Sequence, residues 1–297
     1  MSSLSAWMEA RRVEVEEALG RFLPSVVEPP VRLHEAMTYS VMAGGKRIRP
    51  LLAIAAAEAC GSSAARVMPS ACALEFIHTY SLIHDDLPCM DNDDLRRGRP
   101  TNHKVFGETI AVLAGDALLA HAFKLIGENA QVEGVPAGAA AEVTALVGEA
   151  ASSLGMVGGQ AADWMAEGRK VSESDVVFIH RRKTGALIRA SVLTGAILAG
   201  ADANVRAALS HYGEATGLLF QIVDDVLNVE GDPVALGKAA GSDAARRKAT
   251  FPAVAGLDRA KARGQDLLVE ATSALGILNG RSGILAGIAE FALRRES

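Results

Sequence analysis

Apolar residues recur at the three- and four-residue spacing of a helix through most of this chain of 297 residues. No segment shows the sustained alternation of a β-strand. Several predicted helices exceed about 20 residues, or about 30 Å, which favours one large bundle over two small domains. The predicted helices cover residues 13–23, 33–42, 53–60, 68–86, 109–129, 139–163, 173–198, 205–228, 258–278 and 281–294. We therefore predict an all-α fold, a single helical bundle that forms one domain over residues 1–297.

The composition agrees with a closely packed helical bundle. The chain has 54 alanines but only 13 aromatic residues (8 Phe, 3 Tyr and 2 Trp), and alanine favours helices over strands. The segment 109–129 is apolar on nearly every side, so we expect it to lie buried at the centre of the bundle. Ser172 and Asp175 predict a capping box at the start of the helix over residues 173–198.

Charge and cysteine content exclude several classes of protein. The net charge of -5 is small and no basic character is spread along the chain, which argues against a nucleic-acid partner. Cys60, Cys72 and Cys89 form no CxxC pair, so a disulfide framework or a structural zinc site is not expected, and a cytoplasmic location fits best. The N-terminal segment is charged throughout, and the most apolar stretches contain charged residues. We therefore expect neither a signal peptide nor a membrane span.

Basic residues gather at four places in the chain. A single cluster of this kind is usually a solvated face, but two of these clusters lie directly beside acidic motifs. Guanidinium and ammonium groups next to several carboxylates suit a site that binds phosphate groups and metal ions. The clusters are Lys46, Arg47 and Arg49; Arg96, Arg97 and Arg99; Arg181, Arg182 and Lys183; and Arg246, Arg247 and Lys248.

The first acidic motif ends a strongly apolar predicted helix. Residues 84–94 read HDDLPCMDNDD, and carboxylates at a helix C-terminus are disfavoured unless cations compensate for them. Carboxylate oxygens suit Mg²⁺, which lets substrate phosphates complete its coordination. Asp85 and Asp91 would point about 120° apart on an ideal helix. To face one site they need a break in the helix, and Pro88 is the expected cause.

The second acidic motif lies inside an apolar predicted helix. Residues 221–228 read QIVDDVLN, and Asp224 and Asn228 stand one turn apart on the same face. Two adjacent aspartates in such a helix are costly to bury unless they bind a cation. One aspartate pair is a weak signal, but two pairs on apolar helices together indicate a metal–phosphate site.

Seven short motifs follow one another along the chain: GGKRIRP at 44–50, EFIHTYSLIHDD at 75–86, LRRG at 95–98, GQAAD at 159–163, KTG at 183–185, FQIVDD at 220–225 and LGK at 236–238. From about residue 33 to about residue 257 the chain resembles the trans-isoprenyl (polyprenyl) diphosphate synthases. The resemblance is to their bacterial short-chain branch, which makes farnesyl or geranylgeranyl diphosphate. It implies a bundle of the isoprenoid-synthase type around a central apolar cavity, and a homodimer.

The resemblance also implies the chemistry. An allylic diphosphate, dimethylallyl or geranyl, ionises, and the double bond of isopentenyl diphosphate attacks the cation, so that the chain grows by five carbons. Ionisation requires charge neutralisation on the leaving diphosphate. The resemblance implies three Mg²⁺ ions in the active site. It assigns Asp85 and Asp91 to two of them and Asp224 to the third, with Asp86 and Asp225 supporting the two metal sites.

Further roles are carried over from the same motifs. Thr184 and Gln221 would turn their oxygen dipoles toward the developing cation. The groups expected on the allylic diphosphate are Arg96, Lys183, Lys238 and Lys248, and those expected on isopentenyl diphosphate are Lys46, Arg49, His78 and Arg97.

The product length is predicted from Tyr80, about 7.5 Å along the helix from Asp85. An aromatic ring there, next to Ser81, could form the floor of the tunnel that holds the growing chain. We therefore favour farnesyl diphosphate (C15) as the product, with geranylgeranyl diphosphate (C20) as the alternative. Tyr80 could instead be only a core aromatic residue.

One position departs from the family pattern, because Asn228 stands where an aspartate is usual. Asn keeps an acceptor oxygen but loses the charge, so we expect weaker Mg²⁺ binding at the third site rather than loss of activity. Two other classes of protein stay open. A class I terpene cyclase would not need the isopentenyl diphosphate residues, and its second metal motif is absent. A non-catalytic partner subunit usually loses an aspartate motif, whereas Asp85, Asp86, Asp91, Asp224 and Asp225 are all present here.

Overall fold

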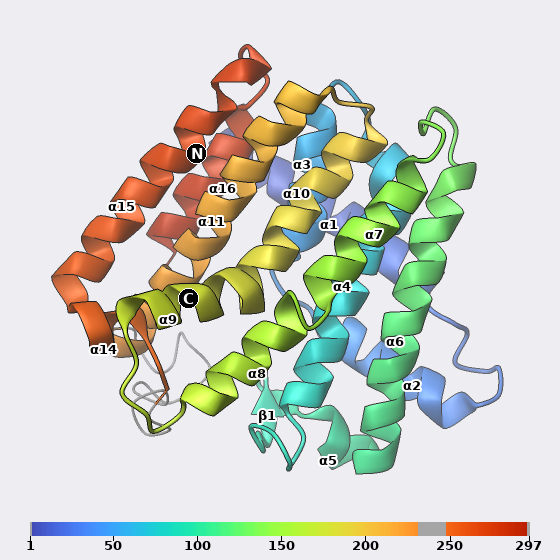
Figure 1. Cartoon of the computed structure of the whole chain (residues 1–297). Helices are drawn as coiled ribbons and strands as arrows, with labels where there is room; N and C mark the ends of the chain where they lie inside the picture. The colour runs from blue at the N-terminus through green and yellow to red at the C-terminus, as the bar shows by residue number, and fades with distance from the viewer. Residues whose placement is uncertain (1, 231–247, 296–297) are drawn as a thin grey trace.

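The computed structural model describes residues 2–230 and 248–295, most of which lie in helices (Figure 1). A π turn at Arg181–Gly185 joins α9 to α10, and β1 (Leu95–Arg96) pairs with β2 (Arg99–Pro100) in an antiparallel hairpin. The prediction of an all-α fold is confirmed. The helices are α1 (Ser2–Phe22), α2 (Val31–Val41), α3 (Ile48–Ala59), α4 (Ala64–Asp85), α5 (Asn102–Phe106), α6 (Glu108–Glu128), α7 (Ala139–Ala151), α8 (Met156–Ala166), α9 (Glu173–His180), α10 (Ala186–Leu198), α11 (Ala203–Glu230), α14 (Phe251–Ala255), α15 (Leu257–Ala274) and α16 (Gly283–Arg294).

Two buried apolar clusters hold the bundle together, and α10 contributes to both. One cluster joins α1, α2, α4, α6 and α7 around side chains such as Phe76. The other joins α3, α11, α15 and α16 around side chains such as Tyr212. On α10, Leu187 belongs to the first cluster and its neighbour Ile188 to the second. The π turn that precedes α10 packs against α8 and α11.

The predicted helix over residues 173–198 is one continuous helical run. It begins with the predicted capping box: the Asp175 N–H donates to Ser172 Oγ at 3.2 Å, and the Ser172 N–H donates to Asp175 Oδ2 at 2.8 Å. The sequence pattern did not predict the π turn within it. Such turns displace the following side chains relative to a regular helix and occur often at functional sites.

The predicted helix over residues 139–163 is wrong as a single helix, because the chain turns at Ser152. Ser152 Oγ donates to the Glu149 carbonyl at 2.8 Å and accepts the Leu154 N–H at 3.1 Å. Hydrogen bonds of a serine side chain to nearby backbone compete with continuation of a helix. The second part, α8, therefore has a direction of its own and packs against the π turn.

The prediction that residues 109–129 lie buried at the centre is also wrong. The helix over this segment, α6, lies at one side of the bundle, opposite α15 (Figure 1). Small residues such as Ala111 and Ala114 are buried on the side of α6 that packs against the bundle, whereas Val112 and Leu113 are 40% and 46% exposed. Apolar residues on every side of a helix do not reveal which side the same chain covers.

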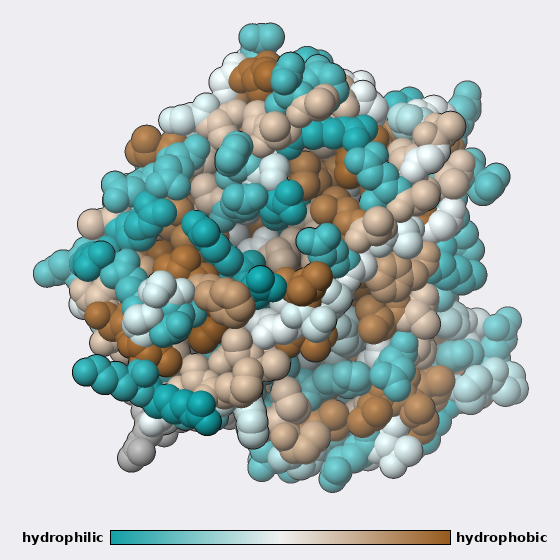
Figure 2. Space-filling model, viewed as in Figure 1, coloured by the Kyte–Doolittle hydropathy of each residue, from teal (hydrophilic) through white to brown (hydrophobic). Residues whose placement is uncertain are grey.

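The structure describes one helical stretch, Glu108–Gln131, that has the length and composition of a membrane-spanning helix, and 39% of its most apolar window is buried inside the protein. Its small-residue face packs against α4 and α2, as expected for a helix of the bundle. On the side of the molecule shown in Figure 2, apolar side chains are interspersed with hydrophilic ones. The described residues thus show no clear membrane span.

Candidate active site

The first acidic motif lies where α4 ends at Asp85. The chain then turns through Pro88, and the Asp91 N–H donates to the Asp85 carbonyl at 2.8 Å. Proline has no N–H for the helical ladder. The turn brings the backbones of two aspartates that are six positions apart into contact, and the predicted break in the helix is confirmed.

Asp85 lies among charges of both signs. The pKa of Asp85 is raised to about 6, mainly by burial; Asp91 and Asp86 act in the same direction, against the attraction of Lys183 and Arg96. A carboxyl group in this setting is stabilised in its charged form by any cation that binds beside it. The end of α4 therefore has the electrostatics of a cation site.

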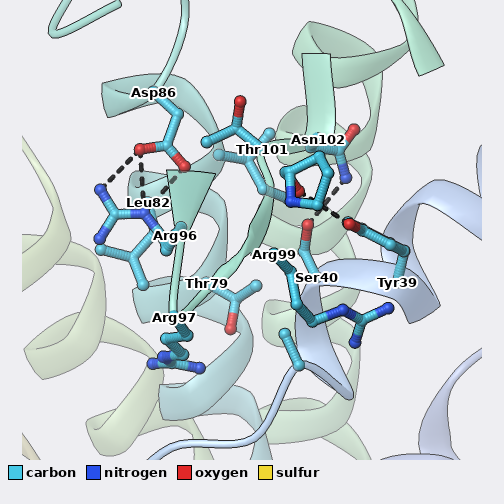
Figure 3. A pocket seen from close by; sticks show the side chains of 13 residues that line it. Tyr39, Ser40, Thr79, Leu82, Asp86, Arg96, Arg97, Arg99, Thr101 and Asn102 are labelled. Atoms are coloured by element: carbon cyan, nitrogen blue, oxygen red, sulfur yellow. Dashed lines mark hydrogen bonds and ion pairs between the residues drawn. The ribbon is translucent and has the colours of Figure 1, made fainter. Parts of the chain in front are cut away.

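Asp86, the next residue, has a different environment. Its side chain is 3% exposed, and it accepts two hydrogen bonds from Arg96, from Nε at 2.8 Å and from a terminal nitrogen at 2.6 Å (Figure 3). A bidentate pair of this kind fixes the orientation of the guanidinium group. The structure therefore gives Asp86 the role of holding Arg96 at the end of α4.

A cavity of about 30 Å³ lies beside this ion pair, with room for roughly one water molecule (Figure 3). Around it the hairpin is fastened to α2: the Tyr39 hydroxyl donates to the Pro100 carbonyl at 2.7 Å, and Asn102 Nδ2 donates to the Ala36 carbonyl at 2.8 Å. The guanidinium carbon of Arg99 stacks 4.4 Å from the centre of the Tyr39 ring. The cavity is too small for a substrate, and its walls keep the hairpin that carries Arg96 in place.

The second acidic motif lies inside α11. Asp224 is half-exposed, with 51% of its side chain accessible, and its Oδ1 lies 2.7 Å from a terminal nitrogen of Arg295. Asp225 is buried, and its Oδ2 accepts the backbone N–H of Phe251 at 2.7 Å. Asn228 follows one turn after Asp224 on the same helix. No sequence signal pointed to Arg295 or Phe251, because both contacts come from residues distant in the chain.

The π turn carries Lys183 and Thr184 into the site. Its backbone touches α8 at Gly159, where a Cβ atom would lie 2.1 Å from the Lys183 nitrogen, so only glycine allows this approach. Lys183 Nζ donates to Asp163 Oδ2 at 2.6 Å, and the Thr184 hydroxyl donates to Gln221 Oε1 on α11. The GQAAD and KTG motifs are thus parts of one structure.

Two lysines lie close to the carboxylates of the first acidic motif. Burial would lower the pKa of Lys183, but Asp163 and then Asp85 and Asp91 raise it. Lys248 Nζ lies 3.6 Å from Asp91 Oδ1. The structure therefore brings together most of the side chains predicted on the allylic diphosphate; Lys238 lies outside the described residues.

A second group of cations lies beside the glycine turn. A terminal nitrogen of Arg97 donates to the Gly44 carbonyl, and a Cβ on Gly45 would lie 2.8 Å from the Arg97 guanidinium carbon. The pKa of Arg49 is lowered to about 10, mainly by burial; Arg97 acts in the same direction, against the attraction of Glu75.

His78 shares this group of cations. Burial and the nearby guanidinium groups, first Arg49 and then Arg97, hold the pKa of His78 well below its usual value. Among the described residues, Arg49 Nε is buried with no hydrogen-bond partner. Positive groups that repel one another and leave a donor unpaired gain from an anion bound between them.

Arg47, in the same sequence cluster, does not belong to this site. It is 2% exposed, donates to Glu16 Oε1 at 2.9 Å and to Glu75 Oε1 at 2.7 Å, and also donates to the Val41 carbonyl at 2.6 Å. These bonds tie α1 and α4 to the turn before α3. Sequence alone could not separate this structural arginine from its neighbours Lys46 and Arg49.

The predicted chain-length residues lie about one turn before the first motif. Tyr80 is 6% exposed and its ring meets the His84 ring edge-on at 5.8 Å, while Ser81 Oγ donates to the His78 carbonyl at 2.9 Å. His84 Nε2 lies 3.0 Å from the Val112 carbonyl of α6. Tyr80 therefore stands against the wall that α4 and α6 form below Asp85.

The carboxylates fit magnesium only together with a phosphate ligand. Among the described residues, no group of three or more His, Cys, Asp or Glu side chains is placed to hold a metal ion without other ligands. Mg²⁺ normally takes one or two carboxylates and completes its coordination with water and substrate phosphates. The crowded Asp85 and Asp91 and the half-exposed Asp224 meet this requirement, whereas Asp86 is paired with Arg96 and Asp225 accepts the Phe251 N–H.

An all-α bundle in which cations lie around an aspartate motif, with a second group of cations beside a glycine turn, suits the class of enzyme that handles diphosphates. The chain belongs to the polyprenyl synthetase family, whose model matches residues 30–274. It is 49% identical over 259 residues to a farnesyl diphosphate synthase of Geobacillus stearothermophilus, covering 87% of this chain and 86% of that one. It is 42% identical over 296 residues to a geranylgeranyl diphosphate synthase of Cyanophora paradoxa, covering 99% and 97%.

Solved structures of prenyl diphosphate synthases have the same fold as this chain. The crystal structure of an FPP/GFPP synthase from Zymomonas mobilis superposes with a TM-score of 0.86 at 35% identity, covering 98% of this chain and 99% of that one. A geranylgeranyl pyrophosphate synthetase from Pyrococcus horikoshii gives a TM-score of 0.89 at 31% identity, covering 99% of each chain. The chain is therefore a prenyl transferase, a short-chain prenyl diphosphate synthase.

Proposed function

We propose that the enzyme joins isopentenyl diphosphate to dimethylallyl or geranyl diphosphate with the help of Mg²⁺, and that its final product is farnesyl diphosphate. The observation that carries the proposal is the presence of two separate cationic groups. Arg96, Lys183 and Lys248 lie around the first aspartate motif, whereas Arg49, with His78 and Arg97, lies beside the glycine turn. Two groups of this kind suit two diphosphates bound at once, as a condensation requires.

The residues would divide the work as follows. Lys183, Arg96 and Lys248 bind the allylic diphosphate and neutralise the charge that builds up on it as the carbon–oxygen bond breaks. Metal ions supply further neutralisation on the same leaving group when bound, and Asp85, Asp91 and Asp224 are the residues that would hold them. Three ions are proposed.

The hydrogen-bonded pair of Thr184 and Gln221 lies between the π turn and α11. Its oxygen dipoles would face the cation that forms after ionisation. Lys46, Arg49, His78 and Arg97 would hold the diphosphate of the second substrate, so that its double bond reaches this cation before water does. Lys238 is proposed on the allylic diphosphate from its motif alone.

Product length rests on Tyr80. Its buried ring against His84 would block further growth below Asp85, which supports a C15 product. The names of the relatives include both farnesyl and geranylgeranyl diphosphate synthases, so geranylgeranyl diphosphate is the competing product. Replacing Tyr80 with alanine should shift the product to C20 or longer with the rate little changed, and an unchanged C15 product would remove Tyr80 from this role.

The same proposal covers assembly and location. The exposed apolar face of α6, with Val112 and Leu113, suits the interface of a homodimer. Cys60, Cys72 and Cys89 are all free, which supports a reducing, cytoplasmic environment. Sedimentation at several protein concentrations tests the dimer, and a monomer at every concentration would contradict it.

The test of the function is direct. Purified enzyme is incubated with Mg²⁺, labelled isopentenyl diphosphate and each allylic primer, and the products are separated by chain length. With Mg²⁺ we expect farnesyl diphosphate as the product. When a chelator is added, we expect no product. A cyclic hydrocarbon would indicate a terpene cyclase, and no product with any primer would indicate a non-catalytic partner subunit.

A further inference from the structure

His180 is a buried histidine that has no role in the proposed binding of the two substrates or the metal ions. It is the last residue of α9, immediately before the π turn, and is 5% exposed. Its Nε2 lies 3.3 Å from Asp225 Oδ2 on α11. Within the described part of the chain its Nδ1 is buried and has no hydrogen-bond partner. The described polar contact of the His180 side chain is therefore the one with Asp225.

Asp225 Oδ2 is shared between two donors. The backbone N–H of Phe251 reaches it at 2.7 Å, and Phe251 itself is 1% exposed. One buried carboxylate thus joins the end of α9, the middle of α11 and the start of α14. A buried carboxylate that loses one of its donors is left partly unsatisfied, which weakens its hold on the other segment or makes it turn toward a different partner.

The segment that Asp225 anchors leads to Lys248. Lys248 precedes Phe251 by three residues, so at most about 10 Å of chain separates them. The side chain of Lys248 is 15% exposed and its Nζ lies 3.6 Å from Asp91 Oδ1, across the site. With so short a connection, the position of Phe251 limits where the Lys248 ammonium can lie.

We propose that His180 is a positioning residue for prenyl transfer: through Asp225 it fixes Phe251 and thereby places Lys248 beside Asp91, on the allylic diphosphate. The inference rests on the function proposed above, because it needs Lys248 to bind that substrate. It also explains why a polar residue occupies a site enclosed by apolar packing. A leucine there would fill the space but donate no hydrogen bond, whereas a glutamine could donate through its amide nitrogen.

The experiment measures binding and catalysis separately. Binding of a non-hydrolysable allylic thiolodiphosphate is measured by calorimetry, and KM is measured for each substrate in turn. We expect His180→Leu to weaken binding of the allylic analogue and to raise the allylic KM by about tenfold, with the KM of isopentenyl diphosphate changed less than about twofold. His180→Gln should recover most of the loss.

Two controls separate positioning from general damage. His121→Leu removes another partly buried histidine, which contacts the Phe22 carbonyl at 2.7 Å on the far side of the core. It should lower the Tm without changing allylic binding. In the second control His180→Leu is combined with Lys248→Ala. If His180 acts through Lys248, the double variant binds the analogue no more weakly than Lys248→Ala alone.

Several results would overturn the inference. These are additive effects of the two substitutions, a lower Tm for His180→Leu with unchanged allylic binding, or equal losses for both substrates. If His180→Leu does not fold, the same single and double variants are made with His180→Asn, whose shorter amide cannot replace the imidazole. A wild-type enzyme that makes no elongated diphosphate would contradict the proposed function instead, a result that the elongation assay reports separately.

Discussion

The two aspartate pairs are built differently but divide their work in the same way. The first pair lies at the end of α4, and the second lies inside the continuous α11. In each pair the first aspartate lies among the charges of the site, while the second is buried and bound to the protein: Asp86 to the Arg96 side chain, Asp225 to a backbone N–H and to His180. Neighbouring helical residues point about 100° apart, so they cannot easily face one ion together.

The second aspartates of the two pairs, Asp86 and Asp225, hold different kinds of partner. Asp86 holds Arg96, a side chain that we propose to bind the allylic diphosphate, whereas Asp225 holds a backbone segment that leads to Lys248. The motifs also differ in charge, because residue 228, one turn after Asp224 in the second motif, is an uncharged asparagine. We therefore expect substitutions in the first motif to have larger effects than the matching substitutions in the second.

The largest effect is expected for Asp85→Asn. Loss of the carboxylate that would hold a metal ion on the leaving group should lower kcat about 1,000-fold. Asp224→Asn should also be strongly impaired, but less so. Initial rates of both variants with saturating substrates test this order. Near-normal activity of Asp85→Asn would contradict the greater importance of the first motif.

The same variant should be more stable without metal. The pKa of Asp85 is raised to about 6 in the folded protein, so folding favours the protonated carboxyl group. Above pH 6 the charged carboxylate lowers the free energy of unfolding, and this stability is regained as the pH falls below 6. Asp85→Asn should therefore raise the Tm in EDTA near neutral pH, with Asp266→Asn, an exposed residue, as a control without effect. A lower Tm for Asp85→Asn would contradict the charge crowding at the end of α4.

The next largest effect is expected for Asp86→Asn. An amide cannot accept both guanidinium bonds as a charged pair, so Arg96 loses its fixed orientation. We expect kcat/KM for the allylic substrate to fall about 100-fold, with little further loss when Arg96→Ala is added. Strict additivity of the two substitutions would show that Asp86 acts independently of Arg96.

Lower pH should weaken metal activation. Below pH 6 Asp85 becomes protonated, and a cation must then displace a proton to bind. The Mg²⁺ concentration for half-maximal rate should rise up to about tenfold per pH unit below this value. A half-maximal concentration that stays constant down to pH about 5 would contradict the raised pKa of Asp85.

Part of this arrangement could be predicted from the sequence. The helix break between Asp85 and Asp91 follows from their spacing and Pro88, and the cation groups follow from short motifs. The separate environments of Asp86 and Asp225 could not be predicted, because their partners are set by tertiary packing. A hairpin of two-residue strands and a π turn give no periodic signal, yet they position Arg96 and Lys183.

The smallest effect is expected for Asn228→Asp. Restoring a charge one turn after Asp224 should lower the Mg²⁺ concentration for half-maximal rate about threefold, a change typical of a single added charge near a partly exposed site. Substrate KM values should stay the same. An unchanged Mg²⁺ dependence would show that the missing acid does not weaken the second motif.

The division of roles within each pair can be seen directly with Mn²⁺ in place of Mg²⁺. Crystals grown with Mn²⁺ and a non-hydrolysable allylic thiolodiphosphate would show the ions by anomalous scattering. We predict ions coordinated by Asp85, Asp91 and Asp224, with Asp86 still paired to Arg96 and Asp225 still bound to the Phe251 N–H. An ion coordinated by a carboxylate oxygen of Asp86 or Asp225 would contradict the account.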